Sequence, residues 1–309
     1  MTKRKIIISA IITLIGLTLI IGGYFIYLIN DLGDKVNENG TSNPIGITDF
    51  FITSFREPLT VLVLGVDARD EQLIEETRSD TIMLVTLNPI TRQVAAVSFP
   101  RDTYVLINDI GYTKLNHAMA YGGVPLLKET IESNFGIPID NYVAMDFVAF
   151  EKIVDQLGGL EIDVEKRMYY KSGDINVNLQ PGLQQMDGQT LLGYVRWRND
   201  SEGDLGRIER QQEAIEGLGE KATSLAALAN INEMLDILGE HIKTDMTTQE
   251  LLDITKKYSN FSKEDWHSMT LGGESARSGE DNLWYYFYSD ENKEELLSFI
   301  ETYRDANIN

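Results

Sequence analysis

The 309-residue sequence contains no cysteine and only three histidines, His117, His241 and His267. Without cysteine, disulfides and thiolate metal sites are excluded, and three histidines argue against a histidine-rich zinc site. Basic residues are also in the minority, because 27 Lys and Arg face 48 Asp and Glu, which gives a formal net charge of −21. So acidic a surface repels nucleic acid. A Walker A loop and a GxSxG motif are both absent.

The N-terminal region contains the only long uncharged run. Residues 6–29 contain no charged side chain, and as a helix they would span about 36 Å, enough to cross a bilayer. Lys3, Arg4 and Lys5 precede the run, so the positive-inside rule predicts a cytoplasmic tail over residues 1–5. A cleaved signal peptide is the alternative, but its apolar region would be shorter and followed by an A-x-A-like site. The sequence therefore predicts a retained single-pass anchor in the cell membrane, an extracellular spacer over residues 30–58, and an extracellular domain over residues 59–309.

The extracellular domain begins with apolar runs and continues with helical patterns. Nearly continuous apolar runs predict central strands covered on both faces, at 59–66, 81–88 and 93–100. Another strand is expected at 160–166, and amphipathic helices are expected at 124–136, 147–159, 187–198, 231–242, 247–258 and 292–306. The last third is therefore expected to be mostly helical. Strands that alternate with helices predict an α/β layered domain with a mixed central sheet.

Charged residues cluster at the ends of these predicted elements, where α/β folds place ligands. Read singly, each is a solvated loop charge, but together they combine many guanidiniums with a few carboxylates. Arginine forks clamp phosphate oxygens, and carboxylates beside phosphates suit a hard divalent cation such as Mg²⁺. That combination is typical of phosphoryl transfer. The set comprises Asp67, Arg78, Asp80, Arg101, Asp102, Lys114, Arg196, Arg198, Arg207 and Arg210.

Arginines are concentrated in residues 196–212, the sequence RWRNDSEGDLGRIERQQ. If its second half is helical, Arg207 and Gln211 lie on the same inward face as Ile208 and Ile215. An inward arginine is costly unless an anion meets it, and a helix N-terminus already favours an anion. His117 could act as a base, but its place at a predicted helix start favours local packing or hydrogen bonding.

Five motifs occur in a characteristic order after the N-terminal anchor: LGVDAR, RSDTIML, SFPRDTYV, KLNHAMAYGG and VRWRNDSEGDLGRIERQQ. This ordered set resembles the LytR-CpsA-Psr family of Gram-positive bacteria. The resemblance implies an α/β/α sandwich that encloses a long apolar pocket for a polyprenyl chain, lined in part by residues of the helices at 124–136 and 147–159. It also implies transfer of a glycopolymer, of wall teichoic acid or capsular polysaccharide type, from undecaprenyl pyrophosphate to peptidoglycan. The product would be a phosphodiester on the N-acetylmuramic acid 6-hydroxyl.

The resemblance also implies roles for individual residues. Asp67 and Asp80 match the acids associated with Mg²⁺ (or Mn²⁺), and Asp204 matches an acid that helps to activate the acceptor. Arg101, Arg207 and Asp204 are the expected catalytic residues. The residues expected around the pyrophosphate are Arg78, Arg101, Lys114, Arg196, Arg198, Arg207, Arg210 and Gln211.

Several functional classes remain open at this point. A membrane-anchored, Mg²⁺-dependent phosphotransferase is the leading interpretation, with the lipid-linked glycopolymer, peptidoglycan and the cytoplasmic membrane as partners. A non-catalytic envelope sensor would need the arginines and the apolar pocket but not Asp204. A pyrophosphate hydrolase could use the same site with water in place of the sugar. A transcriptional regulator is disfavoured, because the predicted extracellular location and the acidic net charge both argue against DNA binding.

Overall fold

A computed structural model of the chain describes residues 55–66, 79–172, 175–198, 203–222, 241–258, 260–278 and 281–305. The expected anchor at 6–29 and nearly all of the expected spacer at 30–58 lie outside these residues. Among the residues that are described, no helix is long and apolar enough to cross a membrane.

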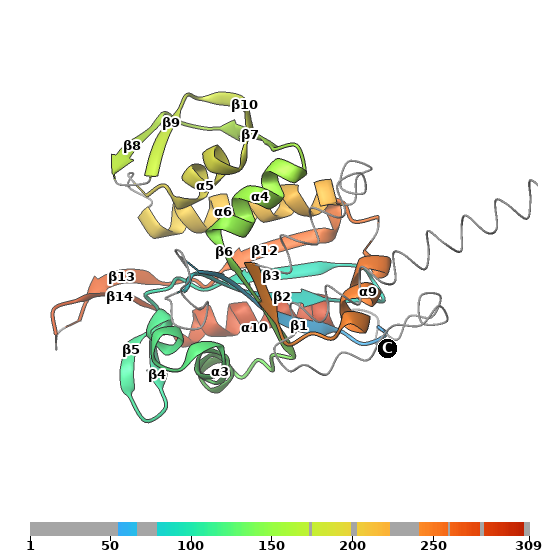
Figure 1. Cartoon of the computed structure of the whole chain (residues 1–309). Helices are drawn as coiled ribbons and strands as arrows, with labels where there is room; N and C mark the ends of the chain where they lie inside the picture. The colour runs from blue at the N-terminus through green and yellow to red at the C-terminus, as the bar shows by residue number, and fades with distance from the viewer. Residues whose placement is uncertain are drawn as a thin grey trace, which may run out of the picture.

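A mixed six-stranded sheet forms the centre of the fold, in the order β11-β6-β1-β2-β3-β12 (Figure 1). Strand β1 pairs in parallel with β6 and antiparallel with β2, and β3 pairs antiparallel with β2 and in parallel with β12. The mixed sheet expected from the sequence is thus confirmed. Its strands are β1 (Leu59–Val66), β2 (Ser79–Leu87), β3 (Val94–Ser98), β6 (Asn141–Asp146), β11 (Ile242–Thr244) and β12 (Trp266–Thr270).

Helices α3 (Leu115–Phe135) and α10 (Asp290–Arg304) cover one face of the sheet (Figure 1). Their apolar residues share one core cluster with Leu62, Leu64 and Leu84 of the sheet, all at most 1% exposed. Helix α3 ends where expected, at Gly136, which adopts a left-handed φ of 74° and donates its N–H to the Glu132 carbonyl. Glycine suits this position because it has no Cβ to clash.

The opposite face of the sheet lies below a layer of three helices, α4 (Phe147–Gln156), α5 (Gly188–Arg196) and α6 (Gly203–Ala222) (Figure 1). Above them lie two short antiparallel pairs. One consists of β7 (Leu160–Val164) with β10 (Gly182–Met186), and the other of β8 (Met168–Ser172) with β9 (Ile175–Leu179). The helices at 147–159 and 187–198 and the strand at 160–166 are therefore confirmed. Helices α4 and α5 approach so closely that a Cβ on Gly188 would lie 2.1 Å from the Glu151 carbonyl oxygen.

The last third of the chain is less helical than expected. Helix α9 (Thr248–Lys257) is confirmed, with a capping box between Thr247 and Glu250, and α10 is confirmed too. Most of the expected helix at 231–242 lies outside the described residues. However, β11, β12 and the hairpin of β13 (Glu274–Arg277) and β14 (Trp284–Phe287) also lie in this third. These strands have only three to five residues and little apolar alternation, and β11 and β12 form by pairing with distant parts of the chain.

A second hairpin projects beside β13–β14 (Figure 1). It consists of β4 (Tyr104–Ile107) and β5 (Gly111–Lys114), which connect β3 to α3. The two hairpins are joined by the backbone, because the Tyr286 N–H donates to the Asp102 carbonyl over 2.9 Å. They therefore extend the sheet at the end where β2 begins and β3 ends.

Candidate functional site

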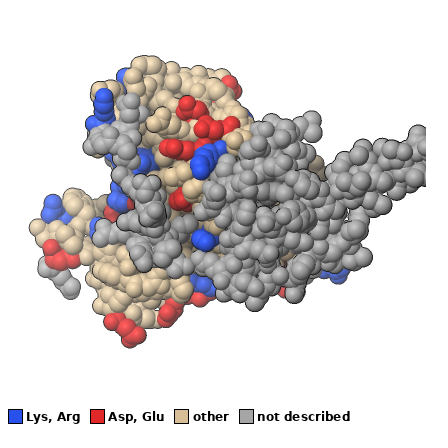
Figure 2. Space-filling view, in the orientation of Figure 1, with Lys and Arg blue, Asp and Glu red and all other residues tan. Residues whose placement is uncertain are grey.

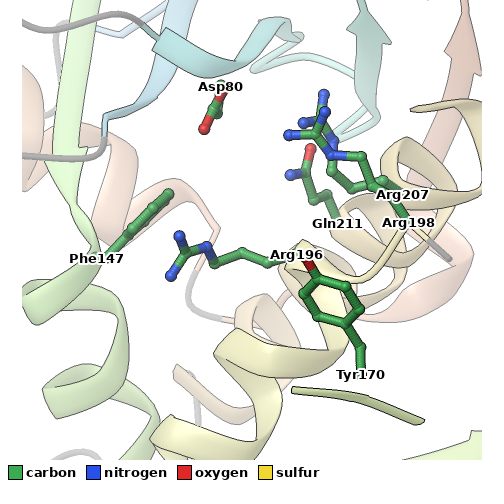
Figure 3. Close-up of a pocket in the computed structure, with 7 residues that line it drawn as sticks. All are labelled: Asp80, Phe147, Tyr170, Arg196, Arg198, Arg207 and Gln211. Atoms are coloured by element: carbon green, nitrogen blue, oxygen red, sulfur yellow. The ribbon is translucent and has the colours of Figure 1, made fainter. Parts of the chain in front are cut away.

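A cationic cavity of about 400 Å³ lies between the sheet and the layer of α4, α5 and α6 (Figure 3). The sheet supplies the only described carboxylate of the lining, Asp80 at the start of β2, and the helical layer with its connection supplies three guanidiniums. Figure 3 shows Arg196 reaching towards Phe147, with Arg198, Arg207 and Gln211 on another side of the cavity and Asp80 across from them. The lining residues are Asp80, Phe147, Tyr170, Arg196, Arg198, Arg207 and Gln211.

The end of α5 and the start of α6 position the cationic side chains. Asp187 caps α5 by accepting from the Thr190 N–H over 2.8 Å, and the helix ends at Arg196, which places Arg198 in the connection that follows. Arg207 and Gln211 are four residues apart on α6 and share one face. The inward placement of Arg207 and Gln211 that the periodicity predicted is confirmed, because both line the cavity.

Arg207 is almost completely buried, with only 2% of its surface exposed. It lies in the first half of α6, where the helix dipole contributes partial positive charge, and two further guanidiniums line the same cavity. Three guanidiniums that line one cavity make it electropositive. The arrangement therefore suits an anionic ligand.

Two aromatic side chains complete the cavity wall. The Arg196 guanidinium lies 4.7 Å from the ring centroid of Phe147, a cation–π contact that holds the arginine in place. Phe147 begins α4 directly after Asp146, whose carboxylate caps the helix by accepting from the Ala149 N–H over 2.7 Å. Tyr170 enters from β8 and is 38% exposed. Neither aromatic was expected at the anion site. Phe147 lies in a helix that was expected near the lipid, and no sequence pattern singled out Tyr170.

Arg101 and Lys114 do not line the cavity but are linked to it through ion pairs. Arg101 donates to Asp80, which does line the cavity, and the adjacent Asp102 pairs with Lys114 over 3.0 Å. Arg101 thereby orients the carboxylate of Asp80. Lys114 is the last residue of β5, directly before α3, and its ammonium also lies 5.6 Å from the ring centroid of Tyr285.

The structure does not bring Arg210 to the cationic cavity. Its guanidinium donates to the Trp197 carbonyl over 2.5 Å and lies 5.1 Å from the Trp197 ring centroid. Arg210 instead lines a separate cavity of about 160 Å³ together with four carboxylates, Asp163, Glu165, Glu209 and Glu213. Its role in this conformation is to fasten α6 to the end of α5, beside acidic neighbours.

Three expected site residues cannot be placed. Asp67 and Arg78 lie outside the described residues, in the segment that connects β1 to β2. Asp204 is the second residue of α6, but its side chain is not described. His117 has the local hydrogen bond that was expected of it, to the Thr113 hydroxyl over 2.8 Å.

The described residues contain no group of three His, Asp or Glu side chains that could hold a metal ion. A magnesium ion that accompanies a phosphate ligand, however, usually takes only one or two protein carboxylates and fills its other positions with water and phosphate oxygens. Asp80 supplies one such carboxylate inside a cavity that otherwise favours phosphates. The donor set is therefore compatible with an ion that enters together with its substrate.

An apolar cavity of about 70 Å³ adjoins the cationic one, and Phe147, Arg196 and Gln211 line both. Its other walls come from β1, β6, α4, α5 and α6, with Val63, Phe150 and Leu192 among them. The helix at 147–159 was expected to contribute to an apolar pocket, and it does. By contrast, Val124, Leu127 and Ile131 of α3 belong to the core on the other face of the sheet.

Burial raises the pKa of the Glu151 carboxyl on α4, behind the cavity wall. The neighbouring carboxylates Asp155 and Asp187 raise it further, whereas the positive charge of Arg196 lowers it. Arg196 therefore interacts electrostatically with the Glu151 carboxyl on α4 and also lines the cavity.

The fold and the cavities define a class of α/β domain in which a cationic cavity lies next to an apolar one. Comparison with known proteins narrows this class, because the sequence matches the LytR_cpsA_psr family over residues 24–300. The chain belongs to the LytR-CpsA-Psr family. The resemblance that the five motifs suggested is confirmed.

Relatives and solved structures agree with this assignment. The chain is 30% identical over 311 residues to the polyisoprenyl-teichoic acid–peptidoglycan teichoic acid transferase TagU of Bacillus cereus, covering 98% of this chain and 99% of the relative. It is 37% identical over 205 residues to TagU of Enterococcus faecalis, covering 66% of each. Among solved structures, Bacillus subtilis TagV superposes with a TM-score of 0.69 at 29% identity, covering 81% of this chain and 98% of TagV. TagT bound to LI-WTA gives a TM-score of 0.65 at 29% identity, covering 81% of this chain and 92% of TagT.

Proposed function

We propose that the protein transfers a teichoic acid from a polyprenyl pyrophosphate carrier to peptidoglycan and joins them by a phosphodiester. One observation supports this most directly: a cavity lined by three arginines opens beside an apolar cavity and shares lining residues with it. A lipid pyrophosphate has two matching parts, an anionic pyrophosphate for the cationic cavity and an apolar chain for the apolar cavity. The Bacillus cereus relative named as a polyisoprenyl-teichoic acid–peptidoglycan transferase matches 98% of the chain, which supports the same substrates here.

The pyrophosphate would occupy the cationic cavity. Arg196, Arg198 and Arg207 would donate to its non-bridging oxygens, and the Gln211 amide would add a neutral donor. The first isoprenoid unit would then enter the apolar cavity past Phe147. At about 70 Å³ that cavity accommodates only the beginning of the lipid, so the rest of a long chain would need space beyond it.

The transfer step follows from this placement. The oxygen of a peptidoglycan hydroxyl attacks the phosphorus that bears the glycopolymer, and a new P–O bond forms. The bond from that phosphorus to the bridging oxygen breaks, so polyprenyl phosphate leaves with the electron pair. Arginines aimed at the non-bridging oxygens stabilise the negative charge that develops. Asp204, at the start of α6, is proposed to accept the proton of the hydroxyl.

A divalent cation, Mg²⁺ or Mn²⁺, is part of the proposal. Asp80 and Asp67 would hold it, and Arg101 would orient Asp80 through their ion pair. When bound, the ion would neutralise pyrophosphate charge and assist the departure of the lipid phosphate. Asp80→Asn should raise the Mg²⁺ concentration required for half-maximal transfer. Unchanged metal dependence in a folded variant would remove Asp80 from the metal site.

The proposed location is the outer face of the cell membrane. Residues 6–29 would form a single-pass anchor with the N-terminus in the cytoplasm, and the domain from residue 59 would face the wall, where the acceptor lies. Protease added to intact, wall-stripped cells should digest the domain. Protection equal to that of a cytoplasmic marker would contradict this topology.

The activity is tested by transfer from a labelled lipid-linked teichoic acid to purified peptidoglycan, with full-length protein in detergent. The parent should form a phosphodiester-linked product, and Asp204→Asn should bind the lipid donor but lose about 10²–10⁴-fold in rate. Binding without transfer by the parent would favour the sensor. Release of the polymer phosphate into solution, without attachment to peptidoglycan, would favour the hydrolase.

A further inference from the structure

One face of the β4–β5 hairpin is exposed and aromatic. The strand register places Tyr104 opposite Lys114 and Leu106 opposite Tyr112, so these four side chains share a face. Val105 and Ile107, on the other face, are at most 1% exposed and pack in the core. Tyr112 is 63% exposed and Leu106 is 40% exposed. The hairpin is therefore anchored by one face and presents the other to solvent.

The aromatic contacts continue onto the neighbouring hairpin, whose Tyr285 is only 4% exposed. Tyr104 stacks on Tyr112 with ring centroids 5.3 Å apart, and it receives the edge of Tyr285 at 5.0 Å. Phe287 lies 5.1 Å from the same Tyr104 ring. We call Tyr104, Tyr112, Tyr285 and Phe287 the aromatic stripe. Since it spans two hairpins, each ring is held in place by another ring.

A chain of contacts connects the stripe to the cationic cavity. Asp80 lines the cavity and pairs with Arg101, and the next residue, Asp102, pairs with Lys114 over 3.0 Å. The Lys114 ammonium in turn lies 5.6 Å from the ring centroid of Tyr285. The stripe thus begins three contacts away from the proposed site of phosphoryl transfer.

The chemistry of the stripe suits a sugar chain. Pyranose rings present C–H groups on their faces, and these pack against the negative face of an aromatic ring, while tyrosine hydroxyls bond to sugar hydroxyls and amides at the edge. The stripe suits a polyanion poorly, because the neighbouring cation Lys114 is already paired with Asp102, and the Asp281 carboxylate accepts from the Tyr285 hydroxyl. Around β4–β5 at the lower left of Figure 2, the surface is mostly uncharged, with acidic side chains at its rim. An anionic membrane would be repelled in the same way.

We propose that the aromatic stripe binds the amino-sugar rings of the acceptor glycan strand and directs one of its hydroxyls towards the cavity. This inference rests on the proposed function, because it presumes a glycan acceptor. Tyr112 provides the exposed stacking face, and Tyr104 and Tyr285 hold it in position. The residues of the stripe act on the affinity for the acceptor, not on the chemical step.

The first test uses full-length protein in detergent and soluble, uncross-linked peptidoglycan glycan fragments, without donor. Calorimetry should show that Tyr112→Ala weakens glycan binding about three- to tenfold, whereas Tyr112→Phe retains most of the affinity because the ring remains. Trp284→Ala is the matched control. Trp284 is 54% exposed on the same hairpin as Tyr285, but strand alternation places it on the other face. Equal losses in Tyr112→Ala and Trp284→Ala would overturn the assignment of this face.

The second test separates this inference from the proposed function. In the transfer assay, Tyr112→Ala should raise the KM for the glycan acceptor by the same factor and leave the KM for the lipid donor unchanged. If the parent transfers teichoic acid and Tyr112→Ala has the parent's acceptor KM, the stripe is not an acceptor site, although the transferase activity stands. If Tyr112→Ala loses binding to anionic vesicles and not to glycan, the stripe contacts membrane and the inference is wrong. Glycan binding that depends on Tyr112 supports it even in a preparation that transfers nothing.

Discussion

Arg207 and Arg210 are one turn apart on α6, yet their side chains line different cavities. Arg207 lies in the cationic cavity with Arg196 and Arg198, whereas Arg210 lies among carboxylates and donates to the Trp197 carbonyl. Residues three apart on a helix differ by about 60° in direction. That rotation is enough to separate a proposed ligand-binding arginine from one that fastens two helices together.

The two arginines should therefore respond differently to the same substitution. Arg207→Met should weaken the binding of inorganic pyrophosphate at least about tenfold, since a charged hydrogen bond contributes about 1.5–3 kcal/mol. It should lower the free energy of unfolding less than Arg210→Met does, because removing one of the three guanidiniums that line the cavity relieves part of their mutual repulsion. Arg210→Met should instead lower the free energy of unfolding by about 1–3 kcal/mol with little change in affinity. Calorimetry and urea unfolding measure the two effects, and the reverse pattern would contradict the placement.

Gln211 and Gln212 form a second contrasting pair. Gln212 is 8% exposed and donates to the Ser98 hydroxyl over 2.9 Å and to the Met269 carbonyl over 3.0 Å, which fastens α6 to β3 and β12. Gln212→Met should lower the free energy of unfolding by about 1–3 kcal/mol, because it leaves buried polar groups without this donor. Gln211→Met should affect stability less and pyrophosphate affinity more. Urea unfolding of both variants checks this, and equal stability losses would contradict it.

The apolar cavity should be sensitive to added volume. Ile215 lines it and is partly exposed, so Ile215→Trp can fill the cavity without overpacking the fully buried core. The variant should bind a polyprenyl pyrophosphate about tenfold more weakly than the parent and inorganic pyrophosphate equally well. Ile90→Trp, at a position 53% exposed in the turn after β2, serves as control. Equal affinity of Ile215→Trp and the parent for the lipid would exclude this cavity as the lipid entrance.

The β13–β14 hairpin should show a measurable pKa coupling. The Tyr285 hydroxyl donates to the Asp281 carboxylate over 2.5 Å, and this bond holds the pKa of Asp281 below its usual range. The same bond is the main cause that raises the pKa of Tyr285 to about 12. The lowered Asp281 pKa stabilises the fold above the carboxyl's unfolded pKa, and this contribution disappears as pH falls through the folded value. The raised Tyr285 pKa stabilises the fold below the tyrosine's unfolded pKa, and that contribution disappears as pH rises through about 12.

Carboxyl NMR titration tests this coupling. Tyr285→Phe should raise the pKa of Asp281 towards the ordinary aspartate value, because the donor that favours the charged form is gone. Asp187, whose pKa is lowered by its hydrogen bond to Thr190 at the start of α5, is the internal control and should keep its low pKa. An Asp281 pKa that stays low in Tyr285→Phe would mean that the hydroxyl does not cause the shift.

The parts of the fold that the sequence predicted depend on local patterns. The apolar runs of β1, β2 and β3, the stop at Gly136 and the inward face of Arg207 and Gln211 all follow from periodicity or capping. Two other features depend on contacts between distant residues. Strand β12 has no buried residue of its own and forms by pairing with β3, and Phe147 becomes part of the site only because Arg196 packs on its ring.

The arginines illustrate the same limit within the site. Their clustering in one stretch predicted an anion site, and three of the four line one cavity. The fourth, Arg210, could not be told apart from the other three by sequence alone. Its placement depends on its contacts with Trp197, which follows the end of α5. Likewise, the ion pair between Arg101 and Asp80 joins the turn after β3 to the start of β2, and no local spacing encodes it.

The central claim is that the cationic cavity binds the pyrophosphate of a polyprenyl carrier. Native mass spectrometry of full-length protein extracted in detergent, with and without added polyprenyl pyrophosphate, tests it most directly. The parent should retain a mass equal to a polyprenyl phosphate or pyrophosphate, and an Arg198→Ala/Arg207→Ala variant that folds normally should retain much less. A parent protein that binds no polyprenyl phosphate at saturating lipid, or a double variant that binds it as well as the parent, would contradict the account.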